Sequence, residues 1–309
     1  SRMPNWVLET KALTRKYKQQ TAVDALNIHV PKGCIYGLLG RNGAGKTTTL
    51  RMIMGLVKPT VGDIEVFGQN IQENAEQIYP RVGSIIETPG FYENLTAPEN
   101  LAILARLRGI HRRDAISYAL SRVGLDHEPE KLVAQYSLGM KQRLGIAAAI
   151  MHEPELLILD EPTNGLDPIG IQEMRNFLLD LCEEKQVTII ISSHILSEIE
   201  QVADLIGVIH KGKLLEEITI GELRKRNRRY LEFQVSNQKK AVVFLEQQFQ
   251  INDYEVHEQG KIRIYSHFGE EGKLNRALIE NNIEVSKITM SEDRLEDYFV
   301  KLIGGRAND

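Results

Sequence analysis

The chain has 309 residues, too many for one compact core and about right for two domains. Its net charge of −4 argues against a protein whose main task is to neutralise a nucleic-acid backbone. The two cysteines, Cys34 and Cys182, lack CxxC spacing, so neither a disulfide framework nor a zinc site is expected. No apolar run approaches the roughly 18 residues of a spanning helix, and no export signal is visible, so we expect a soluble, unexported protein.

Strand patterns dominate the first 220 residues. Alternating residues in "WVLETKALTRKY" (6–17) and "ALNIHV" (25–30) predict an antiparallel edge sheet. Four apolar runs with little alternation follow, which is typical of parallel strands buried on both faces. These runs are "CIYGLLG" from 34, "VGSIIE" from 82, "ELLILDE" from 155 and "VTIIISSH" from 187. Each ends in a polar or glycine-rich element, and ligands bind beyond the carboxyl ends of such strands, so one shared site is predicted there.

Two other segments complete the expected organisation. Apolar residues at three- and four-residue spacing over about 89–152 predict an inserted helical layer. The stretch "RKRNRR" at 224–229 is typical of a solvated charged linker. After it, the order βαββαβ plus a final helix predicts a small ferredoxin-like α+β domain. The expected divisions are an α/β nucleotide-binding domain at 3–222, a linker at 223–229 and an accessory domain at 230–303.

A phosphate-binding loop is predicted at 40–47, where "GRNGAGKT" matches GxxxxGK[ST] between a predicted strand and a predicted helix. Its glycines let backbone N–H groups surround a β-phosphate, and the helix N-terminus adds positive partial charge. Lys46 would reach the β- and γ-phosphates, and Thr47 would offer its hydroxyl to Mg²⁺. The alternative is a glycine-rich loop that arose by chance. The expected nucleotide contacts are Gly40, Asn42, Gly43, Ala44, Gly45, Lys46, Thr47 and Thr48.

Polar side chains also stand at the ends of two other predicted strands. "LLILDE" places Asp160 and Glu161 where an unpartnered carboxylate would be costly. Asp160 suits the water shell of Mg²⁺, and Glu161 suits the orientation of an attacking water. The alternative is a pair that caps the next helix. His194 follows "IIISS", where its imidazole could form a hydrogen bond at the γ-phosphate, although a lone histidine there is more often structural.

The stretch "SLGMKQR" at 137–143 predicts a second anion-binding helix end. Ser137 can cap a helix that begins near Gly139, and the glycine keeps the backbone open. A simple N-cap is the alternative. Because the loop at 40–47 surrounds only one side of a nucleotide, a second helix end would be most useful on the far side of the γ-phosphate. A neighbouring molecule could supply it.

Together these motifs resemble the nucleotide-binding subunit of ABC transporters over about residues 5–220. The resemblance rests on "GRNGAGKT", the signature "YSLGMKQR", "LLILDE", "NGLD" at 164–167 and "SSH" ending at His194. It implies ATP and Mg²⁺ as ligands, hydrolysis of ATP with Glu161, His194 and Lys46 as catalytic residues, and a polytopic membrane permease as a partner.

The same resemblance implies a second copy of the chain, packed head to tail. Ser137 and Gly139 would then act on the γ-phosphate held by the other copy, and Asp167 would lie at the dimer seam. Tyr17 would stack on adenine, with an ordinary strand tyrosine as the alternative.

Two departures from the family pattern stand out. The family's signature usually reads LSGGQ. In this chain, Tyr136, Leu138 and Met140 replace its leucine, its first glycine and its glutamine. Glu87 stands where a glutamine normally contacts the metal, and a carboxylate can still contact Mg²⁺. These variants and the appended C-terminal domain look like the bacitracin-resistance and lantibiotic-immunity branch of exporters.

The predicted function is therefore an ATPase subunit held at the cytoplasmic face of the membrane by its partner, with coupling through the surface at 87–95. Phe91 and Tyr92 are candidate permease contacts, unless they pack locally. The alternative is a soluble ABC-type ATPase acting on nucleic acid or ribosomes, but the paired cassettes or long coiled coil typical of such proteins are absent from this sequence. A GTPase or small-molecule kinase would leave the signature unexplained.

Overall fold

The computed structural model describes residues 5–86, 90–291 and 295–304. The chain divides into two units, Ser1–Ile220 and Gly221–Asp309, a boundary two residues before the predicted end of the first domain. Within the described residues, no helix is both long and apolar enough to cross a membrane.

The central sheet of the first unit has six strands in the order β11-β10-β4-β9-β8-β7. Their bounds are β11 Lys213–Thr219, β10 Leu205–His210, β4 Ile35–Leu39, β9 Thr188–Ser193, β8 Leu156–Leu159 and β7 Val82–Ile85. All neighbours are parallel except β10 and β11. Every residue of β4, β8 and β9 is buried, which confirms the predicted two-sided burial of these runs.

The sequence reading missed β10 and β11. Gly207 interrupts the apolar run of β10, and this glycine is required by packing, because a Cβ there would collide with the hydroxyl of Tyr36 on the neighbouring strand β4. The space lets the Tyr36 hydroxyl donate to Glu217 on β11 at 2.8 Å. The buried Tyr36 hydroxyl on β4 is therefore paired with a carboxylate on β11, on the far side of β10.

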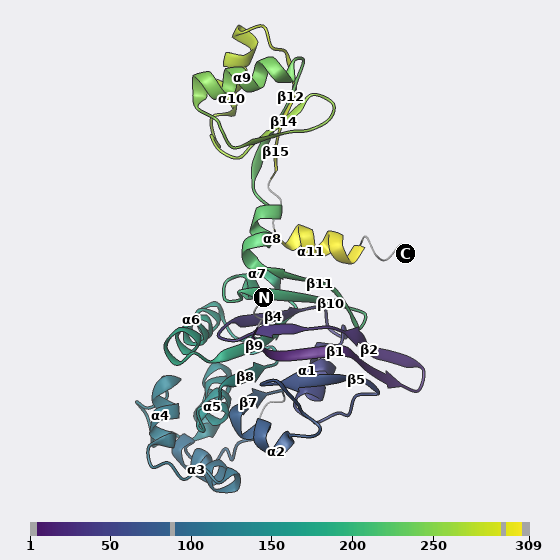
Figure 1. Ribbon diagram of the computed structural model, residues 1–309. Helices are drawn as coiled ribbons and strands as arrows, with labels where there is room; N and C mark the ends of the chain where they lie inside the picture. The colour runs from purple at the N-terminus through teal and green to yellow at the C-terminus, as the bar shows by residue number, and fades with distance from the viewer. Residues whose placement is uncertain (1–4, 87–89, 292–294, 305–309) are drawn as a thin grey trace. The chain divides into compact units, whose positions relative to one another are not determined.

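Helices surround this sheet (Figure 1). α1 (Lys46–Ile53), α6 (Pro168–Lys185) and α7 (Leu196–Glu200) follow β4, β8 and β9. The predicted helical layer is present as α3 (Ala97–Arg108), α4 (Ala115–Arg122) and α5 (Leu138–Ile150), with α5 packed against β7. α3 begins at a capping box formed by Thr96 and Glu99. The remaining helical pieces are α2 (Ala75–Ile78) and the short 3₁₀ turns at Tyr79–Arg81 and Val133–Gln135.

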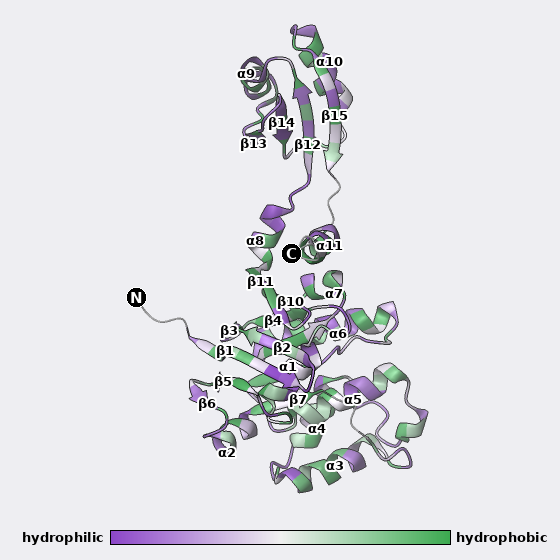
Figure 2. Cartoon of the chain, turned by 90° about the vertical axis from the view of Figure 1, so that its right-hand side faces the viewer, coloured by the Kyte–Doolittle hydropathy of each residue, from purple (hydrophilic) through white to green (hydrophobic). Residues whose placement is uncertain are grey.

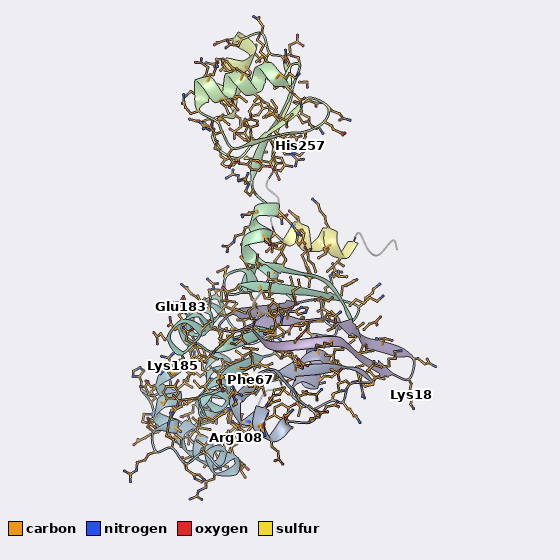
Figure 3. The ribbon with its side chains drawn as sticks, viewed as in Figure 1. Lys18, Phe67, Arg108, Glu183, Lys185 and His257 are labelled. Carbon is orange, nitrogen blue, oxygen red and sulfur yellow. The ribbon has the colours of Figure 1, made fainter. Side chains whose placement is uncertain are left out.

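An antiparallel sheet in the order β2-β1-β5-β6, with β3 paired to β1, flanks the central sheet. The bounds are β1 Trp6–Tyr17, β2 Gln20–Leu26, β3 His29–Pro31, β5 Val61–Val66 and β6 Gln69–Asn70. The tip of the β1–β2 hairpin carries Lys18, which points outward (Figure 3). The prediction of one strand at 25–30 was wrong, because Asn27 separates β2 from β3 and accepts a hydrogen bond from the Ala12 amide.

The second unit has a four-stranded antiparallel sheet in the order β13-β14-β12-β15. Its elements are α8 (Ile220–Arg226), β12 (Tyr230–Val235), α9 (Gln238–Phe249), β13 (Tyr254–Val256), β14 (Lys261–Ile264), α10 (Glu271–Glu280), β15 (Val285–Ser291) and α11 (Leu295–Gly304). This is the predicted split βαβ topology. α9 and α10 each carry hydrophobic and hydrophilic residues (Figure 2), and buried Leu274 and Leu278 place the apolar stripe of α10 in the core.

The predicted linker at 223–229 is helical over its first half, whereas the prediction had no helix there. Residues up to Arg226 are helical, with Leu223 buried. Beyond the helix, Arg228 donates two hydrogen bonds to the Asp253 carboxylate, and its guanidinium lies 3.7 Å from the centre of the Tyr265 ring. The run is therefore partly helical, while Arg224, Lys225, Arg226 and Arg229 are exposed as predicted.

Phe233 is fully buried at the centre of the accessory core. Phe233→Ala should lower the free energy of unfolding of this unit by about 3–5 kcal/mol through lost burial and a residual cavity. Hydrogen exchange of peptides from 230–290, measured by mass spectrometry, would report the change. Val243→Ala, at an exposed position of α9, is the matched control. Equal protection in both variants would contradict the assigned core.

Candidate active site

The loop between β4 and α1 has the backbone shape that a phosphate needs. Gly45 has a φ of 108°, and a Cβ at this position would lie 2.7 Å from the Ala22 carbonyl oxygen, so only glycine fits. Asn42 is exposed, Ala44 is buried and Thr48 is half-buried on the same segment. The predicted phosphate contacts therefore share one loop and one helix start.

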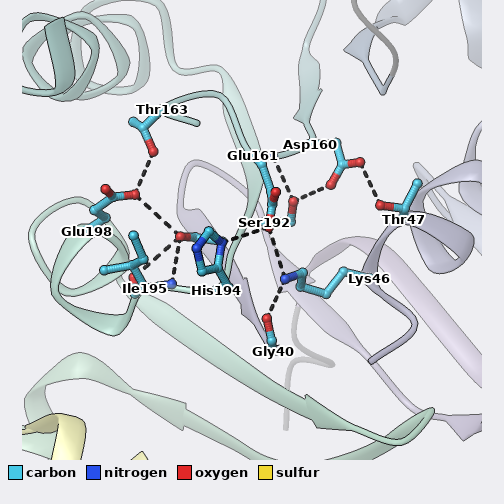
Figure 4. A network of polar contacts seen from close by, with 11 residues as sticks. Gly40, Lys46, Thr47, Asp160, Glu161, Thr163, Ser192, His194, Ile195 and Glu198 are labelled. Carbon is cyan, nitrogen blue, oxygen red and sulfur yellow. Dashed lines mark hydrogen bonds and ion pairs between the residues drawn. The ribbon is translucent and has the colours of Figure 1, made fainter. Parts of the chain in front are cut away.

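Lys46, the first residue of α1, is only 5% exposed. Its ammonium donates to the Gly40 carbonyl and to Glu161 Oε1, the latter at 3.1 Å (Figure 4). A buried ammonium needs such partners, since an unpaired charge in the interior is costly. The two partners also place the ammonium between the loop and the end of β8.

Oxygen atoms suited to Mg²⁺ gather beside the lysine. Thr47 Oγ1 donates to Asp160 Oδ2 at 2.8 Å, and Ser192 Oγ donates to Asp160 Oδ1. No group of three or more His, Cys, Asp or Glu side chains able to hold a metal occurs among the described residues. Mg²⁺ is usually held by one or two carboxylates together with substrate phosphates and water. Thr47 and Asp160 therefore fit a metal ion that arrives with a nucleotide.

Glu161 follows β8 in an unusual backbone conformation. Its φ of 47° lies in the left-handed region, which costs on the order of 1–3 kcal/mol for a residue other than glycine. Its amide donates to Ser192 Oγ at 2.9 Å. Its Oε1 lies 3.1 Å from both Lys46 Nζ and His194 Nδ1. These three contacts hold the strained residue in place.

The Glu161 carboxyl is electrostatically tuned. Burial raises its pKa, but hydrogen bonds and charges from Lys46 and His194 outweigh burial, so the pKa lies below its ordinary value. The carboxylate is therefore ionised at neutral pH and can accept a proton or a hydrogen bond from water. The stability contributed by this pairing is present above the ordinary pKa and is lost as the pH falls through the lowered pKa.

The signature residues do not join this cluster. Ser137 caps α5, which begins at Leu138, one residue earlier than predicted, and its hydroxyl accepts from the Met140 amide at 3.2 Å. Leu138 contacts the turn at Gly165, where a Cβ would lie 2.9 Å from the leucine side chain. In the part of the chain that the structure describes, no hydrogen bond or ion pair links Ser137 or Gly139 to Lys46 or Glu161.

Two other predicted site residues, Tyr17 and Asp167, form no hydrogen bond or ion pair with the cluster among the described residues. Tyr17 ends β1 with 45% of its surface exposed, and the Arg15 guanidinium lies 4.6 Å from its ring centre. Asp167 caps α6, and its Oδ1 accepts from the Gly170 amide at 2.7 Å. Glu87 falls outside the described residues.

Ser192 is the site residue that sequence reasoning missed. Its fully buried hydroxyl joins Asp160 to the Glu161 amide, so it orients both carboxylate-bearing residues. A signal was available, because a polar residue inside an apolar buried strand must have a hydrogen-bond partner. The pattern could not name that partner, which comes from the neighbouring strand β8.

Lys46→Met should raise the pKa of Glu161, because burial would then act with only His194 to oppose it. The measurement is a ¹³C NMR titration of labelled glutamate carboxyls. Lys11→Met is the matched control, since Lys11 pairs with Glu65 instead. An unchanged Glu161 titration in Lys46→Met would contradict the pairing described above.

Comparisons with known proteins agree with this geometry. A family model described as ABC transporter matches residues 23–164. The bacitracin transport ATP-binding protein BcrA of Bacillus licheniformis is 64% identical over 97% of this chain and 98% of its own length. The lantibiotic transport ATP-binding protein SrtF of Streptococcus pyogenes is 44% identical over 68% of this chain and 90% of its own length.

A solved structure agrees with the sequence relatives. It is an ATP-binding subunit of an ABC transporter, 31% identical with a TM-score of 0.62, and the match covers 71% of this chain and 92% of that chain. The chain therefore belongs to the ABC transporter ATP-binding subunits, which are ATPases.

Proposed function

We propose that this ATPase works with Mg²⁺ at two sites, each shared between two copies of the chain, and that it powers a membrane permease exporting a bacitracin-like peptide antibiotic. The observation that carries the proposal is the contact of the Glu161 carboxylate with both Lys46 and His194, beside Asp160 and Thr47. Hydrolysis needs one group that orients water, one that binds phosphate and one that binds the metal. In this cluster Glu161 suits the first role, Lys46 the second, and Asp160 with Thr47 the third.

Each residue has a distinct part in the proposed reaction. Lys46 and the loop amides hold the phosphates and neutralise charge that develops on them. Thr47 and Asp160 would hold Mg²⁺, which supplies further charge neutralisation when bound. Glu161, ionised because of its neighbours, accepts a hydrogen bond from the attacking water. His194 keeps the Glu161 carboxylate in place through its Nδ1.

The position of the signature supports a site completed by a second copy. Ser137 forms no hydrogen bond with the Lys46 cluster of its own chain among the described residues, although its type and helix-start position suit an anion. Leu138 of the signature is 50% exposed, and Ile169, two residues after the Asp167 cap, is 67% exposed. Exposed apolar side chains beside an unused anion site favour a protein partner there.

A permease is the proposed membrane partner, and through it the subunit would lie at the cytoplasmic face of the membrane. The relatives are named as transport ATP-binding proteins, while no described helix of this chain could cross a membrane. A cavity of about 680 Å³ lies between β7 and the ends of α3 and α5, where Arg108 (Figure 3), His111 and His152 contribute to its wall. Exposed Tyr92 precedes α3, and its amide donates to Asn100 near the start of that helix.

The proposal of a bacitracin-like peptide as the transported compound rests on relatives that match nearly the whole chain. Two bacitracin transport proteins, from Bacillus licheniformis and Enterococcus faecalis, are 64% and 57% identical to it, and both matches include the accessory unit. The nucleic-acid alternative receives no comparable support. The basic run that could have served it is partly engaged, since Arg228 pairs with Asp253.

Mixing inactive variants tests the shared sites. Lys46→Ala and Ser137→Ala should each be inactive alone, yet their mixture should recover about one quarter of the wild-type ATPase rate if subunits exchange and the two sites act independently. The recovery arises because a mixed dimer keeps one site with an intact Lys46 from one copy and an intact Ser137 from the other. Steady-state phosphate release measures the rate.

The matched control mixes Lys46→Ala with Glu161→Gln. Both residues belong to the same half of a site, so each mixed dimer would have two damaged sites and should stay inactive. Equal recovery in both mixtures, or full activity of Ser137→Ala by itself, would contradict the shared-site arrangement.

Transport is tested in cells. Co-expression of the chain with a permease that co-purifies with it should raise the bacitracin concentration needed to stop growth, and Glu161→Gln should abolish that protection. Glu183→Gln, an exposed position on α6, is the matched control. Protection that persists in Glu161→Gln would show that ATP hydrolysis at this site does not drive resistance.

A further inference from the structure

We propose that Glu198 on α7 is a positioning residue for hydrolysis, which ties the segment after Glu161 to the segment that carries His194. The inference rests on the proposed roles of Glu161 and His194. Glu198 itself is not placed at the phosphates, and it would act only through the two segments that it joins.

One carboxylate oxygen makes the connection (Figure 4). Thr163 Oγ1 donates to Glu198 Oε2 at 2.6 Å, and Ser193 Oγ lies 3.5 Å from the same oxygen. Thr163 comes two residues after Glu161, and Ser193 comes directly before His194. The Glu198 carboxylate therefore contacts both segments. The contact is short on the Thr163 side and longer on the Ser193 side, where the hydroxyl also lies 3.4 Å from the Ile195 carbonyl oxygen.

The segment that carries His194 is held by the hydroxyl of Ser193. The Ile195 amide donates to Ser193 Oγ at 3.0 Å, so the residues on either side of His194 share one hydrogen-bonded turn. Ser193 is buried, which protects this bond from water. The orientation of the His194 imidazole thus depends on where the Ser193 hydroxyl is held.

Side-chain packing between the two segments is incomplete. Both segments line a cavity of about 220 Å³, whose wall includes Glu161, Thr163, His194 and Glu198. Hydrogen bonds therefore help to fix the distance between the segments, and the bond from Thr163 to Glu198 adds to those that Glu161 forms with Ser192 and His194. Glu161 also has a left-handed φ of 47°, a conformation that persists only where its surroundings over-determine it.

Loss of the tether should therefore slow hydrolysis more than it weakens ATP binding. Glu198→Ala and Thr163→Val should each lower kcat by about 10- to 100-fold, because a misplacement on the order of 1 Å is that costly for a positioned reaction. KM for ATP should stay close to the wild-type value, since Lys46 and its loop are untouched. The double variant should be no slower than the slower single variant, because both changes break one contact.

Conservative variants separate positioning from a general structural role. Glu198→Gln keeps an acceptor oxygen for Thr163, and Thr163→Ser keeps the donor, so both should retain most of the wild-type kcat. Glu183→Ala is the matched control for loss of a carboxylate on a nearby helix. Thermal unfolding of every variant should start well above the assay temperature.

The kinetics of phosphate release with purified full-length protein decide the question. Wild-type kcat in Glu198→Ala, beside an inactive Glu161→Gln, would overturn the positioning role alone. A kcat in Glu198→Gln as low as in Glu198→Ala would also overturn it, because the retained acceptor would then have no effect. Wild-type kcat in Glu161→Gln would instead overturn the proposed function on which the inference rests.

Discussion

The buried ammonium of Lys46 is the constraint on which the rest of the site depends. A charge that is 95% removed from solvent must be paired, and here its partners are the Gly40 carbonyl and the Glu161 carboxylate. One partner lies at the end of β4 and the other at the end of β8. The pairing therefore joins the phosphate loop to the carboxylate that would act on water, and it keeps that carboxylate ionised.

Sheet order turns separate motifs into one site. β4, β9 and β8 are adjacent and parallel, so the residues that follow them meet at one edge, although the loop after β4 is more than a hundred positions from the segments after β8 and β9. Parallel strands require long crossovers, and here the crossovers carry the helical layer and α6. Strain at Glu161 is held by contacts from β9 and α1, which shows how much the geometry relies on neighbouring elements.

The accessory unit follows a different physical logic. Its sheet buries one face against α9 and α10 through a core of alternating apolar residues such as Leu231, Phe233 and Ile262. Strict alternation is a strong local signal, because a one-residue slip would move every apolar side chain to the wrong face. The split βαβ topology could therefore be predicted from pattern alone, whereas the basic run before it could not be assigned correctly without knowing that Asp253 pairs with Arg228.

By itself the sequence determined what local chemistry encodes: the phosphate loop, the two-sided burial of three strands (β4, β8 and β9), the amphipathic helices and the order of elements in the accessory unit. Only the tertiary structure decided which strands are neighbours, that Ser192 joins Asp160 to Glu161, and that Gly207 makes room for the Tyr36 hydroxyl. The reason is that periodicity reports the environment of a residue and not the identity of its partner. Partners are chosen by sheet order and by the need of each buried polar group for a hydrogen bond, and both arise from the whole fold.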